Sequence, residues 1–195
     1  MAFWTDANFE PKRQFRWKLN IIYGGEASAI EPFYAKKVTK PKLTMTPGSH
    51  KYLDRTFNFP GHVAWDPITA TFVDDTGNTV LSRLVGAFGS SNYSDISGDF
   101  LNGQKFKTIS KGRMAATVTG DSNDPPVLGG PTHILIEQIN AEGEPVETWK
   151  LYNPFIKDLT PGGDLDYEGD GLVEYTAGIV YDWAEVIGEN IKRFT

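Results

Sequence analysis

The stretch QFRWKLNIIY (residues 14–23) has the clearest periodicity in the chain. Large apolar residues occupy every second position: Phe15, Trp17, Leu19, Ile21 and Tyr23. The positions between them hold Arg16, Lys18 and Asn20. Because successive side chains of a strand point to opposite faces, this alternation predicts a β-strand with one face buried.

The same period continues downstream. EPFYAKKVTKPKLTM (residues 31–45) predicts one or two short strands, interrupted at Pro41 because proline has no N–H to donate. GHVAWDPITATFVDD (residues 61–75) predicts a strand that is kinked or bulged at Asp66 and Pro67, since its apolar positions change there from odd to even. Its expected inward residues are Val63, Trp65, Ile68, Ala70 and Phe72.

One segment has the period of a helix instead. Apolar residues at helical spacing run from Val80 to Phe88, either Asn78 or Thr79 can cap the start, and Gly89 can end it. We therefore expect one α-helix, roughly over residues 79–88.

The last third of the chain predicts three more strands. HILIEQI (residues 133–139) and VETWKLY (146–152) flank the turn NAEGEP, in which Gly143 can adopt a positive φ, so they predict a hairpin. LVEYTAGIVYDW (172–183) predicts a long strand with apolar residues on both faces.

Residues 90–131 are rich in Gly, Ser, Asn and Asp and predict a long loop, with one short strand in RMAATVTG. The chain of 195 residues suits one domain, residues 1–195, with this loop inserted at about 90–131. The expected fold class is mainly β, a β-sandwich or partly open barrel with one flanking α-helix.

Charge is distributed unevenly along the chain, whose net charge is −6. Residues 1–60 hold ten Lys and Arg against five Asp and Glu, whereas residues 131–195 hold four against thirteen. Solvated strand faces would explain such runs. Alternatively, the basic surface of one copy meets the acidic surface of another.

The composition gives little support for catalysis. The chain has no cysteine, and His50, His62 and His133 are not at a spacing that holds a metal on one helix. No nucleophile elbow, phosphate-binding loop or dinucleotide-binding motif occurs. We predict no enzyme activity, catalytic residue, metal or cofactor. Without an apolar run of 18 residues or a secretory signal, we expect no membrane span and a protein kept in the cytosol.

The acidic stretch DLDYEGDG (residues 164–171) begins like a calcium-binding loop. Its acids fall at loop positions one, three and five and Gly169 at six, but position twelve is Tyr175 where a bidentate Glu is required. A solvated acidic turn before a strand is therefore favoured. Five tryptophans could form a glycan platform, although Trp17, Trp65 and Trp183 are in phase with inward positions and are favoured as core or interface anchors.

Several segments together resemble the tail tube proteins of T4-type contractile-tailed bacteriophages. They are FRWKLNI, LDRTFNFPGHVAWDPITATFVDD, VLSRLVGAF, ILIEQINAEGEPVETWKLYNPFIKDL and DLDYEGDGLVEYTAGIVYDW. The resemblance lies in their order and spacing over much of the chain. Residues 103–131 look longer than the corresponding stretch of shorter members. The alternatives within this class are a baseplate tube-initiator and a tube protein of a related injection machine.

This resemblance implies a structural virion protein that assembles in the host cytoplasm. Its subunits form hexameric rings whose sheets join into an inner barrel, and the rings stack into a hollow tube. Implied partners are other copies, the tail sheath, baseplate and tape-measure proteins, while DNA passes through the lumen without specific binding. The alternative from another class is a monomeric β-sandwich module that binds glycan or calcium.

The charge split and this resemblance together suggest a subunit interface. We expect it to include Arg16, Lys18, Lys36, Lys37, Lys40, Lys42, Asp164, Asp166, Glu168, Asp170, Glu174, Tyr181 and Trp183.

Overall fold

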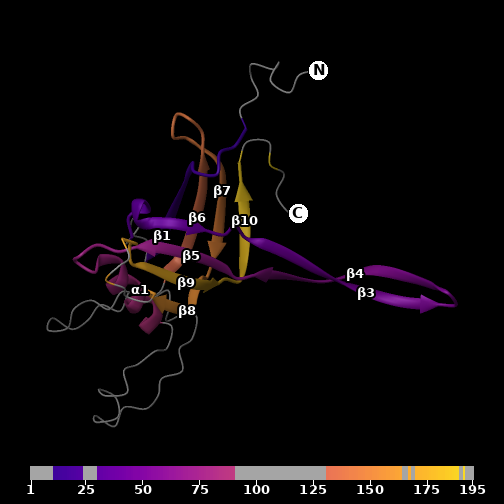
Figure 1. The fold of residues 1–195 in the computed structure, drawn as a ribbon. Helices are drawn as coiled ribbons and strands as arrows, with labels where there is room; N and C mark the ends of the chain where they lie inside the picture. Colours follow the sequence, from indigo (N-terminus) through magenta and orange to yellow (C-terminus); the bar gives the residue numbers. More distant parts are fainter. Residues whose placement is uncertain are drawn as a thin grey trace, which may run out of the picture.

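The computed structural model describes residues 11–23, 30–90, 131–163, 167, 170–188 and 191. In these parts the chain forms two four-stranded sheets, one two-stranded sheet and one α-helix (Figure 1). The expected mainly β fold is confirmed, and the described strands form no closed barrel. The long loop expected at 90–131 and its short strand lie almost wholly outside the described residues.

Sheet A has the strand order β1-β6-β7-β10 and is antiparallel throughout. Its strands are β1 (Trp17–Tyr23), β6 (Pro131–Ile139), β7 (Pro145–Tyr152) and β10 (Trp183–Ile187). The predicted hairpin is the β6–β7 pair, and Gly143 in its turn has φ +86. Gly143 is thus in the left-handed region that favours glycine.

Sheet B has the order β2-β5-β9-β8 and is also antiparallel. It comprises β2 (Ala35–Val38), β5 (Ile68–Val73), β9 (Glu174–Val180) and β8 (Phe155–Pro161), with a short 3-10 helix, η1 (Pro32–Tyr34), before β2. Labelled strands of the two sheets cross in Figure 1, and the core lies between the sheets.

The core confirms most of the predicted inward positions. Leu19 and Ile21 of β1 are 2% and 3% exposed, and Ile68, Ala70 and Phe72 of β5 are all buried. The inward prediction for Phe15 was wrong: it lies before β1 and is 76% exposed. The inward prediction for Val63 was wrong: it is 51% exposed.

Helix α1 (Thr79–Ser90) confirms the predicted helix and continues one residue past Gly89. Its cap differs from the prediction. Carboxylate oxygens of Asp75 accept the backbone N–H of Thr79, and those of Asp74 accept the next two N–H groups. These N–H groups have no partner inside a helix, so the preceding acids stabilise its start.

The predicted long strand 172–183 is in fact split. β9 ends at Val180, Tyr181 is buried, and β10 starts at Trp183 in the other sheet. Apolar residues on both faces fit this arrangement, because the segment passes from one side of the core to the other.

Candidate functional site: a projecting hairpin

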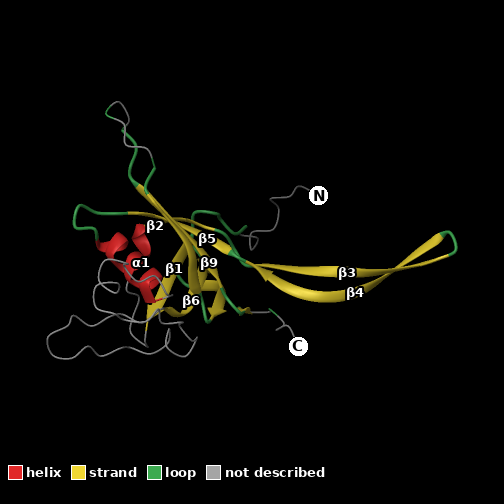
Figure 2. Cartoon of the chain, turned by 90° about the horizontal axis from the view of Figure 1, so that it is seen from below, coloured by secondary structure: helices red, strands yellow, loops and turns green. Residues whose placement is uncertain are grey.

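The third sheet is a hairpin that projects from the body of the molecule (Figures 1 and 2). It consists of β3 (Lys42–Tyr52) and β4 (Arg55–Asp66). Among the described strands, these two pair only with each other. We call this hairpin the arm.

Two prolines separate the arm from sheet B. β2 pairs with β5 as far as Val38 opposite Ala70, and the arm begins where Lys42 pairs with Asp66. Pro41 and Pro67 lie between these pairs, one on each strand. Because neither proline can donate a ladder hydrogen bond, a long hairpin divides here into a sheet part and a projecting part. The break predicted at both prolines is thus confirmed.

The first anchor of the arm is Asp66. Its carboxylate forms an ion pair with Lys42 at 2.8 Å and accepts a hydrogen bond from Thr44 at 3.1 Å, which together hold the pKa of Asp66 below its usual value. The Tyr181 hydroxyl donates to the Asp66 backbone oxygen at 2.9 Å. Burial and the nearby Asp66 charge raise the pKa of Tyr181 to about 12, so it remains a donor.

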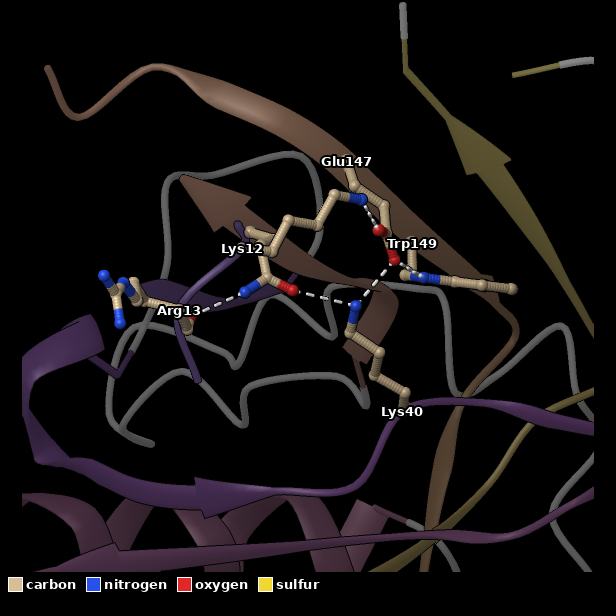
Figure 3. Close-up of polar contacts among 6 residues, drawn as sticks. Lys12, Arg13, Lys40, Glu147 and Trp149 are labelled. Atoms are coloured by element: carbon tan, nitrogen blue, oxygen red, sulfur yellow. Dashed lines mark hydrogen bonds and ion pairs between the residues drawn. The ribbon is translucent and has the colours of Figure 1, made fainter. Parts of the chain in front are cut away.

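The second anchor is Glu147 on β7 (Figure 3). One carboxylate oxygen accepts from Lys40 Nζ at 2.7 Å and from Trp149 Nε1 at 2.6 Å, and the other pairs with Lys12. Burial alone would raise the pKa of Glu147, but these donors lower it to about 2. Lys40 lies in the link between β2 and the arm, so this ion pair ties the root of the arm to sheet A.

Gln138 on β6 completes the second anchor. Its side-chain oxygen accepts from Lys40 at 2.9 Å, and its side-chain nitrogen donates to the Arg13 carbonyl at 2.8 Å. The segment before β1, the β6–β7 hairpin and the start of the arm are therefore held at one point. This fixes the arm where it leaves the body.

Beyond its root the arm exposes apolar side chains. Every residue of β4 from Arg55 to Ala64 is exposed, including Phe57 at 49% and Phe59 at 57%. Leu43, Met45 and Val63 are exposed as well. A lone two-stranded hairpin is at best marginally stable in water, and contiguous exposed apolar surface usually marks an interaction site.

The tip of the arm has a strained backbone conformation at Leu53. Leu53 and Asp54 form a two-residue turn between the paired residues Tyr52 and Arg55. Leu53 has φ +55 and its side chain is 79% exposed. Asn and Gly are the usual residues for a positive φ in such turns, so a leucine there costs conformational energy without any packing inside the described chain.

The predicted interface residues lie in several places. Three lysines form ion pairs within the chain: Lys36 with Glu174, Lys40 with Glu147 and Lys42 with Asp66. Lys36, Lys37 and Lys40, with Lys12, line a groove of about 660 Å³ whose apolar part includes Trp17 and Val38. Lys18 is exposed on β1, opposite Glu137 of β6, and Arg16 lies just before β1.

The remaining predicted residues are divided between core and surface. Tyr181 is buried and belongs to the root of the arm, while Trp183 on β10 is 47% exposed and stacks on Tyr152 at 3.8 Å. Asp170 is exposed. Three others, Asp164, Asp166 and Glu168, lie outside the described residues.

Residue patterns alone did not reveal the arm. Its signal was present in RTFNF (residues 55–59), where Phe57 and Phe59 alternate with polar residues, and in the two-residue turn at Leu53 and Asp54. Alternation indicates a strand but not whether anything covers its apolar face.

The described residues contain no cluster of three or more His, Cys, Asp or Glu that could hold a metal. His50 and His62 lie on the arm, whereas His133 lies on β6, where burial and the charge of Lys150 lower its pKa. No described helix is long and apolar enough to cross a membrane.

No protein-family model and no curated protein matches the chain. Several solved structures do match the chain. A chain of the six-fold symmetrised baseplate of the anti-feeding prophage matches with a TM-score of 0.60 and 13% identity, over 94% of this chain and 99% of that one. The chain has the fold of contractile injection system components.

Two more structures share this fold. A chain from the extended sheath-tube complex of the extracellular contractile injection system PVC has a TM-score of 0.58 and 14% identity, covering 92% of this chain and 93% of that one. A chain of the cap that terminates the anti-feeding prophage tube has a TM-score of 0.57 and 13% identity, covering 97% and 100%. At such identities the likeness establishes the fold, and function rests on further argument.

Proposed function

We propose that this chain is the structural subunit of the hollow inner tube of a contractile tail or injection machine. The observation that carries this proposal is the arm, which is fixed at its root, apolar along its length and uncovered by the described chain. A structural subunit needs partners on such a surface and needs no active site. Similarity to chains of a sheath-tube complex and a tube-terminating cap, over nearly the whole length, supports the same role.

The sheet edges support closure into a ring. Each sheet has four antiparallel strands, so its two edge strands run in opposite directions. Rotation about an axis parallel to the strands preserves their direction, so β10 of one copy can pair with β1 of the next and continue the antiparallel order. Such pairing would also remove exposed sheet edges.

Charges on these edges are complementary. β1 and β2 carry Lys18, Lys36 and Lys37 and no carboxylate, although Lys36 is paired with Glu174. The opposite edges, β8 and β10, carry Asp158 and Glu185 beside one lysine. Opposite charges favour contact between unlike edges and disfavour contact between like ones.

The two ends of sheet B favour stacking. The arm leaves one end of β5, and Asp74 and Asp75 follow the other end. Figure 1 draws the arm and α1 on opposite sides of the body. The tip carries Lys51 and Arg55 beside Asp54, so its charge is opposite to that of the acidic end. Head-to-tail contacts of this kind repeat without closing and build filaments.

The finer features follow from the sequence resemblance. We propose hexameric rings in a phage tail, with the sheath outside, baseplate and tape-measure proteins as partners, and DNA passing through the lumen without specific binding. A baseplate initiator or a tube of a related injection machine is the second candidate, favoured by the similarity to a baseplate chain. Neither role requires a cofactor or catalysis.

Size-exclusion chromatography and negative-stain microscopy of the purified chain over a range of concentrations test the proposal. Rings and hollow tubes are expected from the natural chain, and rings that do not elongate are expected from an initiator. The matched control joins Thr44 to Ala64 through a two-residue turn, which removes the rest of the arm and keeps Trp65, which packs against the core, and the Asp66 anchor. This variant should fold and form no tubes. A natural chain that stays monomeric at high concentration would contradict the proposal and favour a binding module.

A further inference from the structure

The groove beside the root of the arm lies between the two four-stranded sheets. Sheet A contributes Trp17 of β1 and Ile136 of β6 to its lining, and sheet B contributes Val38 of β2. Ile136 is buried, and the other two side chains are partly buried and pack against the core. The volume of about 660 Å³ is within the range of ligand sites. The groove therefore extends the apolar core into a space that the described residues leave open.

The rim of the groove is basic. Four of its described lining residues are lysines: Lys12, Lys36, Lys37 and Lys40. The described carboxylate among the lining residues is Glu137, which accepts a hydrogen bond from Asn20 at 3.1 Å. Three of the lysines are paired with Glu147 or Glu174, whereas Lys37 is exposed and forms no ion pair within the described residues. A fitting occupant therefore combines apolar side chains for the floor with a carboxylate for the rim.

The segment that precedes the groove in sequence has this composition. Residues 1–10, MAFWTDANFE, include three aromatic side chains and two carboxylates but no lysine or arginine. Lys12 lines the groove, so Phe9 is three residues from its wall and at most about 11 Å away along the chain. Covalent attachment of this kind gives the segment a local concentration at the groove on the order of millimolar, so weak contacts are enough to hold it there.

The other acidic stretch of the chain fits the groove less well. Residues 164–171 hold four carboxylates, but their one aromatic side chain, Tyr167, is fully exposed. Asp170 is also exposed, and Leu172, just after this stretch, is 71% exposed. Because these apolar side chains lie in water, the stretch has none left to cover the floor of the groove.

We infer that residues 1–10 fold back into the groove of their own chain, with Phe9 against Trp17 and Val38 and a carboxylate of the segment beside Lys37. The occupied groove completes the core between the sheets. It also supports the root of the arm, because Lys40 lines the same groove and lies in the link between β2 and the arm. The inference concerns the single chain and does not depend on the proposed function.

Introduced cysteines test this placement directly, because the chain has none of its own. A chain with Phe9→Cys and Val38→Cys should form an internal disulfide under mild oxidation in dilute solution. The matched control combines Phe9→Cys with Val85→Cys on α1, outside the groove. Val85 is 49% exposed, so its thiol is accessible, and this pair should stay reduced. Mass spectrometry after thiol labelling counts the free cysteines.

Three results of this experiment would overturn the inference. They are a reduced first pair, equal oxidation of both pairs, and disulfide-linked dimers as the main product of the first pair. Dimers would mean that the segment occupies the groove of a second copy.

Truncation of single phenylalanines tests whether the segment is buried. Phe9→Ala should lower the folding equilibrium constant of the monomer about tenfold or more. Phe15→Ala is the matched control in the same part of the chain, and it should change this constant less than about twofold, because Phe15 is 76% exposed. Urea denaturation below the concentration of assembly measures both, and equal effects would contradict the inference. Failure of the natural chain to form tubes would remove the proposed function but leave this inference standing.

Discussion

The body and the arm are built from the same kind of antiparallel strand, yet they differ in what covers them. β5 alternates buried residues with exposed or half-buried ones, and Phe72 is 1% exposed. In β4, by contrast, every residue from Arg55 to Ala64 is exposed, and Phe59 is 57% exposed. An aromatic residue in a strand therefore stabilises the monomer only where a second layer packs on it, and the arm has no such layer in the described chain.

The largest expected difference comes from truncating one phenylalanine in each region. Phe72→Ala should lower the free energy of unfolding by about 3–5 kcal/mol, because it leaves a cavity in the core. Phe59→Ala should change it by less than about 0.5 kcal/mol, because the side chain is mostly in water. Urea denaturation of the monomer at low concentration measures both. Equal losses would mean that the arm is part of the cooperative core.

The sequence predicted the covered region better than the uncovered one. The alternation around Leu19 and Ile21 predicted β1 correctly, because one face of that strand packs against the core. Val63 follows the same pattern, but the expected layer above it does not exist in the described chain. Periodicity records which side of a strand is apolar, and only the tertiary fold decides whether that side is covered.

Two other features of the fold were not predicted from the sequence: the change of sheet at Tyr181 and the anchors of the arm. Residues 172–183 are apolar on both faces, so their pattern did not reveal that the chain changes sheets at Tyr181. Asp66 and Glu147 lie far apart in sequence and had no pattern of their own, yet they anchor the same arm. Prolines were a better guide: Pro41 and Pro67 correctly predicted the interruption at the root. The role of the thirteen predicted interface residues stays a prediction.

The root of the arm, where the two regions meet, should have an intermediate effect. Glu147→Gln removes the charge that binds Lys12 and Lys40, so it should destabilise the chain by about 1–2 kcal/mol at pH 7 after allowance for solvent screening. The pKa of Glu147 is lowered from 4.5 to about 2 in the folded chain. Its contribution is therefore present above pH 4.5 and is lost as the pH falls towards 2.

Chemical denaturation between pH 7 and pH 2 measures this effect. The natural chain and Glu147→Gln should differ most near neutral pH and converge at the acid end. Glu142→Gln in the exposed β6–β7 turn is the control, and it should match the natural chain throughout. A difference between the natural chain and Glu147→Gln that does not vary with pH would show that packing, rather than charge, holds this anchor.

The smallest expected change in stability is at the tip, where the arm is furthest from the body. Leu53→Gly relieves the positive φ and should stabilise the turn locally by up to about 1 kcal/mol, while global unfolding is unchanged. Hydrogen exchange of the outer arm should slow slightly in the monomer. Assembly should nevertheless weaken severalfold, because the exposed leucine is lost as a contact. Slower hydrogen exchange in the monomer together with weaker assembly would show that Leu53 destabilises the turn of the monomer and stabilises the assembly. Unchanged assembly would show that the strained backbone at Leu53 affects the turn alone.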